Sequence, residues 1–423
     1  MRWDRNGFLK PVPSAERLKD FVRICPFSAS ASNEDVIAAE RFPDAVTIDK
    51  RIGRFEAAYV GHAVESPFRR DGSSGGLTSW VAAELLRTGR VDGIAHVAPV
   101  DPSSGAFFAY RISRTLDELS AGAKSRYYPV ELSQVLAEIR STPGRYAIVG
   151  IPCFIKAIHL LRRADPLIFE RVTHTLGLFC GHMKSAAMVE SFAWQLGTEL
   201  SRVNALDYRK KDDRRPANWY RVQLDLRDGD SAEQDWWHLA DGDWGAGFFQ
   251  SPACNWCDDV VAETADISFG DAWVEPYSSD GRGTNVVIVR SKELQAVIEK
   301  ARAEGRLTLE AVDADFIAQT QAAGLRHRRD GLAYRLSWRR GRLVPPKRVR
   351  ASTNLPLRRK LVYRLRSAIA HWSLPVFRLA RMLRSPGIYT CWARAMLRLY
   401  QSLTWSRGRL GGFFDSLFPR PEI

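Results

Sequence analysis

Four of the six cysteines lie where they could bind a metal. Cys254 and Cys257 form a Cys-x-x-Cys pair, which in a turn can hold one metal, while Cys153 and Cys180 each end a strand-like run. Together the four thiolates would suit either zinc or a [4Fe–4S] cluster. The two single cysteines could also be buried thiols that bind nothing. The spacing does not choose between these interpretations.

A second candidate is the glycine-rich segment FRRDGSSGG, residues 68–76, which lies between an expected strand and an expected helix. Its small residues would let backbone N–H groups approach an anion, and the following helix N-terminus adds positive potential. Arg69 and Arg70 could pair with a phosphate through two hydrogen bonds each. The segment therefore suits a cofactor phosphate, although ordinary turns of α/β proteins have the same composition.

These residues need elements to position them, and short β-like runs alternate with helical stretches along the body of the chain. This alternation predicts an α/β fold, with a mixed sheet as the body and helices flanking it. We expect strands over residues 57–64, 93–100, 146–153, 175–182 and 285–291, and helices over residues 77–89 and 154–164. We expect residues 207–238 to form polar hairpins.

The composition narrows the class of protein. The chain has 423 residues, enough for two or three hydrophobic cores. It has no uninterrupted apolar run of about 18 residues, so we expect no membrane-spanning helix. The N-terminal sequence lacks an apolar stretch followed by a small-residue cleavage site, so we expect a cytoplasmic protein. Cysteines in that reducing compartment are typically thiols or metal ligands.

The net charge of +14 is concentrated in the C-terminal tail. Residues 344–423 contain 16 Lys and Arg but only two acidic residues, whereas residues 1–343 contain 46 basic and 46 acidic residues. No recognised nucleic-acid-binding fold accompanies the charge, so we expect no nucleic-acid partner. Residues 344–356 form a proline-containing linker between the body and this tail.

The tail itself predicts basic amphipathic helices. The apolar faces of two helices would be Leu357, Leu361, Leu365 and Ile369, then Ile388, Trp392, Ala395 and Leu399. The opposite faces would carry Arg358, Arg359, Arg364, Arg366, Arg394 and Arg398. Such helices, with Trp and Tyr, are typical of peripheral attachment to anionic lipid, which here would be the inner membrane. A helical pair packed on the body or on a partner protein is an equal alternative.

Five segments resemble, in order along the chain, the motifs of the coenzyme F-420 hydrogenase/dehydrogenase beta-subunit family. They are FRRDGSSGGLTSWVAAELLRTGRVDG, KSRYYPV, YAIVGIPCFIKAI, GLFCGH and CNWCDDVVAETADISFGDAW, all within residues 55–290. The family includes flavin subunits of archaeal hydrogenases and formate dehydrogenases, plastid 7-hydroxymethyl chlorophyll a reductase, and bacterial members associated with surface-polysaccharide genes. Its members bind FAD and [4Fe–4S] clusters, and they pass electrons between clusters, flavin and a substrate such as coenzyme F-420.

The resemblance implies roles for particular residues. It makes Cys153, Cys180, Cys254 and Cys257 the ligands of one [4Fe–4S] cluster. It places FAD at Arg70, Gly72, Ser73, Ser74, Gly75 and Gly76, with Ser125, Arg126 and Tyr127 close by. His182, two residues after a cysteine ligand, could donate protons near the redox centre. Asp271 could support the flavin or the cluster, although a carboxylate after a strand is more often a helix cap.

The N-terminal segment departs from the family pattern. Many members begin with a Cys-x-x-Cys-x-x-Cys run followed by Cys-Pro, but here only Cys25 and Pro26 remain. We therefore expect one cluster rather than two or three, and no redox role for Cys391 in the tail. The expected parts are a degenerate ferredoxin-like segment (1–54), a flavin-binding part (55–145), a part with the cluster cysteines (146–343) and the basic tail (344–423).

The combined interpretation is an iron–sulfur flavoprotein oxidoreductase with an unidentified organic substrate or cofactor. Coenzyme F-420, or another deazaflavin or flavin, is a candidate substrate, and a ferredoxin-like protein or a reductase is the expected electron donor. The resemblance to bacterial members suggests a role in surface-polysaccharide metabolism. Two alternatives stay open: a non-catalytic electron-relay subunit of a larger complex, and a zinc-stabilised binding protein with a degenerate flavin pocket.

Overall fold

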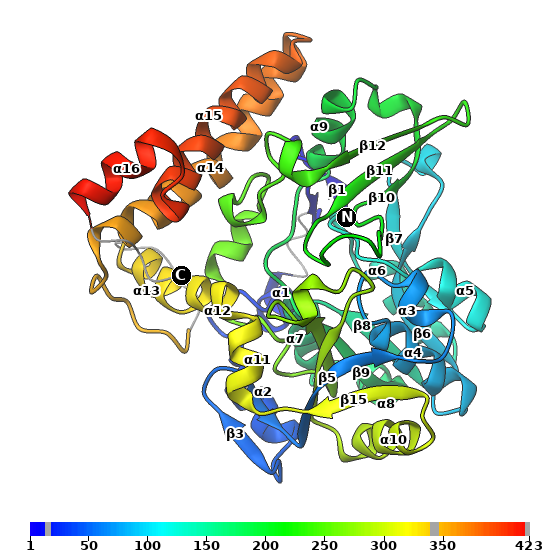
Figure 1. Cartoon of the computed structure of the whole chain (residues 1–423). Helices are drawn as coiled ribbons and strands as arrows, with labels where there is room; N and C mark the ends of the chain where they lie inside the picture. Colours follow the sequence, from blue (N-terminus) through cyan, green and yellow to red (C-terminus); the bar gives the residue numbers. More distant parts are fainter. Residues whose placement is uncertain (13–17, 339–346, 419–423) are drawn as a thin grey trace.

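The computed structural model describes residues 1–12, 18–338 and 347–418. Its centre is an eight-stranded sheet with the order β15-β5-β14-β13-β9-β8-β6-β7 (Figure 1). The strands are β5 (Ala57–Ala63), β6 (Gly93–Pro99), β7 (Phe108–Ser113), β8 (Tyr146–Gly150), β9 (Val172–Leu178), β13 (Ile267–Asp271), β14 (Asn285–Val289) and β15 (Leu307–Ala311). Strands β13, β9, β8 and β6 are parallel, and each remaining strand pairs antiparallel with its neighbours. The predicted mixed α/β body is confirmed.

Helices cover both faces of this sheet, because neighbouring residues of a strand point to opposite faces. Ile94 of β6 packs in one apolar cluster with helices α4 and α10. Ala95, the next residue, packs in a different cluster with helices α6, α7 and α8. The bounds are α4 (Leu77–Arg87), α6 (Ser133–Ser141), α7 (Pro152–Arg162), α8 (Pro166–Arg171) and α10 (Lys292–Ala303).

The expected strands and helices of the body are found with shifts at their ends. The shift that matters for the site concerns residues 146–153, where β8 ends at Gly150 and α7 begins at Pro152. Proline suits the first turn of a helix, because its missing N–H would have no helical acceptor there. Cys153 therefore lies in the first turn of a helix, and its predicted place at the end of a strand is wrong.

A three-stranded antiparallel sheet accounts for most of the region predicted to form polar hairpins. It consists of β10 (Val203–Asp207), β11 (Arg221–Leu226) and β12 (Ser231–Asp235). Helix α9 (Ala187–Gln195) packs beside it, because Met188 and Phe192 share an apolar cluster with Val203 and Leu224.

The tail forms three helices that pack on the body and lie together at one end of the molecule (Figure 1). They are α14 (Leu357–Met382), α15 (Pro386–Trp405) and α16 (Gly408–Leu417). Phe377 of α14 stacks on Trp194 of α9 with 4.5 Å between ring centroids. The hydroxyl of Ser373 accepts the backbone N–H of Phe249 at 3.0 Å. This packing agrees with the alternative of a helical pair docked on the body.

The predicted faces of the tail helices are wrong at several positions. Arg358, predicted on a solvated face, is 1% exposed, and it donates to the carbonyl of Leu403 at 2.8 Å and to Asp415 at 2.6 Å. Leu357, predicted on a packed face, is 57% exposed, and Ala395 is also exposed. Carbonyls near the end of α15 and the Asp415 carboxylate give an arginine charged and neutral acceptors, which apolar periodicity does not reveal.

Shorter elements complete the described chain. They are β1 (Arg2–Trp3), β2 (Leu9–Lys10), α1 (Leu18–Ile24), α2 (Glu34–Arg41), β3 (Thr47–Asp49), β4 (Gly53–Phe55), α3 (Phe68–Asp71), α5 (Leu116–Ala121), α11 (Ala314–Thr320), α12 (Ala322–Arg328) and α13 (Asp330–Ser337). Within the described ranges, no helix is both long enough and apolar enough to cross a bilayer.

Candidate redox site

The four predicted cysteine ligands come from three segments near the carboxyl ends of parallel strands. Cys153 follows β8 and Cys180 follows β9, and these strands are parallel neighbours whose carboxyl ends lie at one edge of the sheet. Cys254 belongs to the short 3₁₀ helix η6 (Pro252–Trp256), and Cys257 comes directly after it. The backbone N–H of Cys180 donates to the carbonyl of Val260 at 2.9 Å, which joins the second segment to the third.

The structure brings the four thiols within electrostatic reach of one another. Burial raises the pKa of the Cys153 thiol well above its usual value, and each of the other three thiols raises it further. Burial likewise raises the pKa of Cys257 to about 11. All four cysteines are free thiols, and the Cys254 sulfur accepts the backbone N–H of Met183 at 3.3 Å. The four thiols therefore lie close enough to interact, and their assignment as ligands of one cluster stays a prediction.

The four thiols do not converge on a single point. In the part of the chain that the structure describes, no group of three or more His, Cys, Asp or Glu is arranged to hold one metal ion. Zinc binds thiolate sulfur at about 2.3 Å, so four thiolates around one zinc ion lie within roughly 4 Å of each other. The identity of a bound metal or cluster stays a prediction.

A buried arginine stands beside these thiols. Arg328, the last residue of α12, is 1% exposed. Its guanidinium donates to the carbonyls of Cys180 at 3.2 Å, Cys254 at 3.4 Å and Gly181. Burial opposes its charge, yet the four thiols together raise its pKa above the usual value. Arg328 thus holds two of the cysteine segments and places a positive charge beside all four sulfurs.

Three further cations lie around the same region. Arg335 of α13 donates to the carbonyl of Asn255 at 2.9 Å, and buried Lys184 donates to the carbonyl of Phe248 at 2.7 Å. Arg366 of α14 has a buried Nε atom with no hydrogen-bond partner among the described residues. In the described ranges, neither these three cations nor Arg328 forms an ion pair with a carboxylate. Buried charges need an opposite charge, so the site fits an anionic occupant.

The predicted flavin loop follows β5, and its glycines are enclosed by the protein itself. A Cβ at Gly75 would come within 2.8 Å of the backbone nitrogen of Asn285 and the carbonyl of Gly61. Gly76 has φ of 80°, and a Cβ there would lie 2.4 Å from the Phe68 carbonyl. A Cβ at Gly72 would also meet this carbonyl, at 2.9 Å. These glycines permit the close approach of strands and helix, which is a structural role that sequence reasoning did not assign to them.

The polar residues of the loop differ in their surroundings. Ser74 is buried and donates to the carbonyl of Thr284 at 3.0 Å. The Ser73 hydroxyl accepts the backbone N–H of Ser125 at 2.8 Å, which joins the two predicted flavin segments. Arg70 is exposed and pairs with Asp71 at 2.7 Å. The assignment of these residues to FAD stays a prediction.

An aromatic stack connects the second flavin segment to the cysteines. Tyr127 lies against Trp244 with 4.6 Å between ring centroids, and His182 stacks on Trp244 at 4.3 Å. A Cβ at Gly181 would lie 2.4 Å from the Trp244 ring nitrogen, so this indole also touches the segment that contains Cys180. Arg126 lies over the ring of Phe108 at 4.8 Å and donates to the carbonyl of Ala123.

The two predicted catalytic residues have different environments. His182 is buried, neither ring nitrogen has a hydrogen-bond partner among the described residues, and burial lowers its pKa well below the usual value. Asp271 ends β13 and accepts from Arg209 at 3.0 Å. No helix of the described chain begins directly after Asp271, so the helix-cap interpretation is wrong.

Comparison with known proteins assigns the family. Residues 58–137 match the N-terminal part of the family described as coenzyme F-420 hydrogenase/dehydrogenase, beta subunit, and residues 144–315 match its C-terminal part. Together these matches cover more than half of the chain. The chain belongs to this family. The F-420 hydrogenase/dehydrogenase beta-subunit family has an oxidoreductase or electron-transfer role, which this chain shares at that level.

The solved structures give the same fold. A chain of the F-420-reducing [NiFe] hydrogenase complex from Methanosarcina barkeri has a TM-score of 0.54 and 17% identity, and the match covers 72% of this chain and 99% of that one. At this identity the similarity concerns the fold alone. No curated protein matches the chain.

The family match contains the cysteines but not all of their surroundings. All four cysteines lie within residues 144–315, whereas Arg328, Arg335 and Arg366 lie beyond them. Sequence reasoning missed Arg328 and Trp244. Arg328 belongs to a run of basic residues, and such a run is typical of a solvent-exposed helix face. Trp244 lies in a glycine-containing stretch without a periodic apolar pattern. No feature of the sequence distinguishes either residue from its neighbours.

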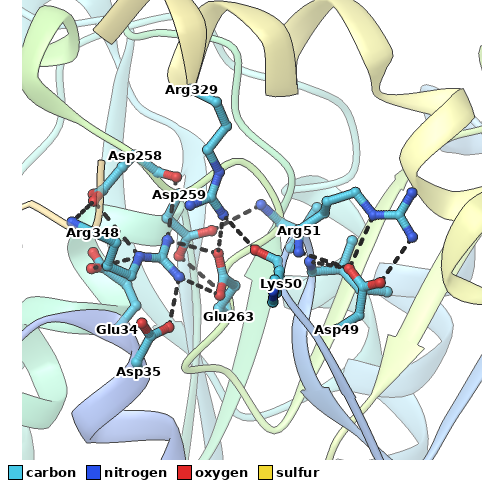
Figure 2. Close-up of polar contacts among 12 residues, drawn as sticks. Glu34, Asp35, Asp49, Lys50, Arg51, Asp258, Asp259, Glu263, Arg329 and Arg348 are labelled. Carbon is cyan, nitrogen blue, oxygen red and sulfur yellow. Dashed lines mark hydrogen bonds and ion pairs between the residues drawn. The ribbon is translucent and has the colours of Figure 1, made fainter. Parts of the chain in front are cut away.

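A network of ion pairs involves residues 258–263, which directly follow Cys257; residues 254–263 are called the cysteine loop below (Figure 2). Arg348, at the start of the segment that leads to the tail, pairs with Glu263 at 2.6 Å and Asp35 at 2.9 Å. Its backbone N–H donates to Asp258, the residue after Cys257, at 3.2 Å. This network connects α2, the cysteine loop and the chain that enters the tail.

Proposed function

We propose that this protein is an electron-transfer oxidoreductase that binds one [4Fe–4S] cluster at Cys153, Cys180, Cys254 and Cys257, and FAD beside residues 68–76. The observation that carries the cluster is the closeness of four thiols to buried Arg328, which forms no ion pair with a carboxylate among the described residues. A cluster held by four thiolates is an anion and would neutralise this cation.

When bound, the cluster supplies single electrons, and FAD exchanges electrons in pairs with an organic substrate. The chain positions the two groups. Arg328 and Arg335 fix the carbonyls of the cysteine segments, and Ser73 fixes the Ser125 segment. The rings of Tyr127 and Trp244 lie against each other between the two regions.

The substrate belongs to the class of organic molecules or cofactors that accept two electrons, and coenzyme F-420 or another deazaflavin or flavin is our first candidate. The donor is a ferredoxin-like protein or a reductase. A role in surface-polysaccharide metabolism stays a prediction from the resemblance to bacterial family members. Cys25 has no predicted cysteine partner in the N-terminal segment, so one cluster is proposed.

The experiment is purification without oxygen, followed by an absorption spectrum and analysis of iron, zinc and flavin. We expect brown protein with about four irons per chain and bound FAD. Colourless protein that contains zinc and no iron would instead support a zinc-stabilised binding protein.

A second candidate is a relay subunit without a substrate of its own. The similar structure from Methanosarcina barkeri is a chain of a hydrogenase complex, which favours this candidate. A flavin-loaded, isolated chain that passes electrons from an artificial donor to a deazaflavin would exclude it, because a relay subunit has no site for an organic substrate.

We also infer that the protein attaches to the cytoplasmic face of the inner membrane through α16. Leu410, Phe413 and Leu417 recur at three- and four-residue spacing on this helix and are 42%, 54% and 54% exposed. Exposed Arg407 and Arg409 stand at its first turn. An exposed apolar face beside basic residues suits anionic lipid.

A further inference from the structure

Arg328 is placed to act on the redox centre without being a ligand. It is 1% exposed, and its three hydrogen bonds go to the carbonyls of Cys180, Gly181 and Cys254. In the described ranges it forms no ion pair with a carboxylate. Its largest electrostatic interactions are with the four cysteine thiols. The positive charge of this residue is therefore directed at whatever the thiols hold.

A fixed cation beside a cluster changes the free energy of its reduction. Reduction adds one negative charge to the cluster, and a nearby guanidinium stabilises that charge more strongly in a buried site than in water. The reduction potential of an iron–sulfur cluster depends on net charge and hydrogen bonding around it. A buried arginine should therefore raise the potential, and its neutral replacement should lower it.

Arg328 lies outside the part of the chain that matches the beta-subunit family, which ends at residue 315. Two of the three neighbouring cations also come from beyond that point, Arg335 from α13 and Arg366 from α14, whereas Lys184 lies within the match. The ion pairs of Arg348 with Glu263 and Asp35 hold the later segment against the cysteine loop (Figure 2). The C-terminal part is thus a structural component of the cysteine site.

We propose that Arg328 is a positioning residue that sets the reduction potential of the cluster through its charge, so that the segment beyond the family match tunes electron transfer. This inference rests on the cluster proposed above. It differs from a purely structural role, in which Arg328 only braces the carbonyls of the two cysteine segments.

Three variants of the full-length protein separate charge from bracing. Arg328→Gln removes the charge, Arg328→Lys keeps the charge but lacks the guanidinium fork, and Arg335→Gln is the matched control. Replacing Arg335 likewise removes a hydrogen bond to the cysteine loop, the one that Arg335 donates to the carbonyl of Asn255. Unlike Arg328, its largest electrostatic interactions are with Arg366 and Arg328 and not with the thiols.

The measurement is a redox titration of each anaerobically purified protein, followed by electron paramagnetic resonance and iron analysis. At a fixed solution potential we expect Arg328→Gln to show at least a tenfold lower ratio of reduced to oxidised cluster. This ratio corresponds to a reduction potential that is lower by about 59 mV for one electron. Arg328→Lys should stay within a factor of about three of the wild type, and Arg335→Gln should change less than Arg328→Gln.

Each outcome is decisive. Wild-type protein without iron contradicts the cluster itself, whereas iron-loaded Arg328→Gln with an unchanged potential contradicts only the role of Arg328. If Arg328→Gln cannot hold iron while Arg328→Lys can, the requirement for charge is supported. Iron loss in both Arg328 variants would overturn the proposal in favour of bracing, and an equal shift in Arg335→Gln would overturn the special role of Arg328.

Discussion

Single residues at the candidate site have roles that their types alone do not fix. Gly75 and Gly76 have the composition of a phosphate-binding loop, but backbone atoms of Gly61, Asn285 and Phe68 occupy the space beside them. The glycines are required because strand, turn and helix approach each other closely there. Sequence reasoning could find the position of this turn but not what fills the space, because contacts between distant segments leave no local signal.

Gly75→Ala should therefore destabilise the protein. The new Cβ would lie 2.8 Å from two backbone atoms of the sheet, and such overpacking costs about 1 to 3 kcal/mol. Denaturant unfolding monitored by circular dichroism should show the loss. The control is Gly387→Ala in α15, where a Cβ meets nothing within 4 Å and stability should be unchanged or slightly higher. Equal stability of Gly75→Ala and wild type would show that the loop can relax.

The cysteines could be grouped from the sequence because ligand chemistry restricts both residue type and spacing, but their role as ligands stays a prediction. Cys254→Ser or Cys257→Ser should remove most of the iron and the brown colour, since serine does not replace a thiolate ligand of iron–sulfur clusters. Cys25→Ser and Cys391→Ser should keep the wild-type iron content, measured per folded chain. Loss of iron in Cys25→Ser would contradict the single-cluster assignment.

At the scale of elements, the alternation of strands and helices was predictable, because the central strands of the sheet are apolar and helix-like stretches separate them. The start of α7 was predicted too late, at residue 154, even though Pro152 is a typical first helical residue. The faces of α14 were predicted poorly, because Arg358 is buried against acceptors from α15 and α16. Long-range partners of that kind cannot be read from periodicity.

The pairing of β6 with β7 carries a pH-dependent contribution to stability. His96 of β6 is buried against Ser113 of β7, with 2.7 Å between Nε2 and the hydroxyl oxygen, and burial lowers its pKa to about 4. Between about pH 6.5 and 4 the unfolded chain binds this proton and the folded protein does not, so the free energy of unfolding falls as the pH falls. The loss approaches roughly 3 kcal/mol near pH 4.

Replacing His96 by Gln should reduce this dependence. Urea unfolding at several values between about pH 7 and 4.5 should give a shallower decline for His96→Gln than for the wild type, because glutamine has no proton to bind. The comparison of slopes matters, since carboxylates affect both proteins alike. Parallel slopes would show that His96 becomes charged without cost in the folded state.

At the scale of the whole molecule, the tail shares an apolar core with the body. Removal of residues 344–423 would uncover the apolar cluster that contains Phe248, Phe249 and Met188. It would also remove Arg348 from its carboxylate partners. A truncated protein could therefore fail to bind vesicles because it is unfolded and not because it lacks a membrane-binding surface. Substitution of exposed residues is the appropriate experiment.

The triple variant Leu410→Ser, Phe413→Ser, Leu417→Ser should keep its iron and its unfolding midpoint but bind anionic vesicles at least tenfold more weakly in a flotation assay. The three side chains are 42% to 54% exposed, so their replacement removes less burial than a change in the core would. The matched control is Phe169→Ser on α8, which is 62% exposed and far along the chain from the tail. Wild-type protein that ignores anionic vesicles at low salt would contradict the membrane proposal and favour a protein partner.

The ion pairs between Arg348 and residues of α2 and the cysteine loop also have a consequence for biogenesis. The ribosome delivers Glu34 early, the cysteines midway and Arg348 late, and the last helices follow it. A nascent chain therefore exposes its thiols before Arg328, Arg335 and Arg366, the arginines that would neutralise the proposed cluster, have been synthesised. We expect iron insertion to await release of the complete polypeptide, so prematurely terminated products would carry unprotected thiols and be recognisable to proteolytic surveillance.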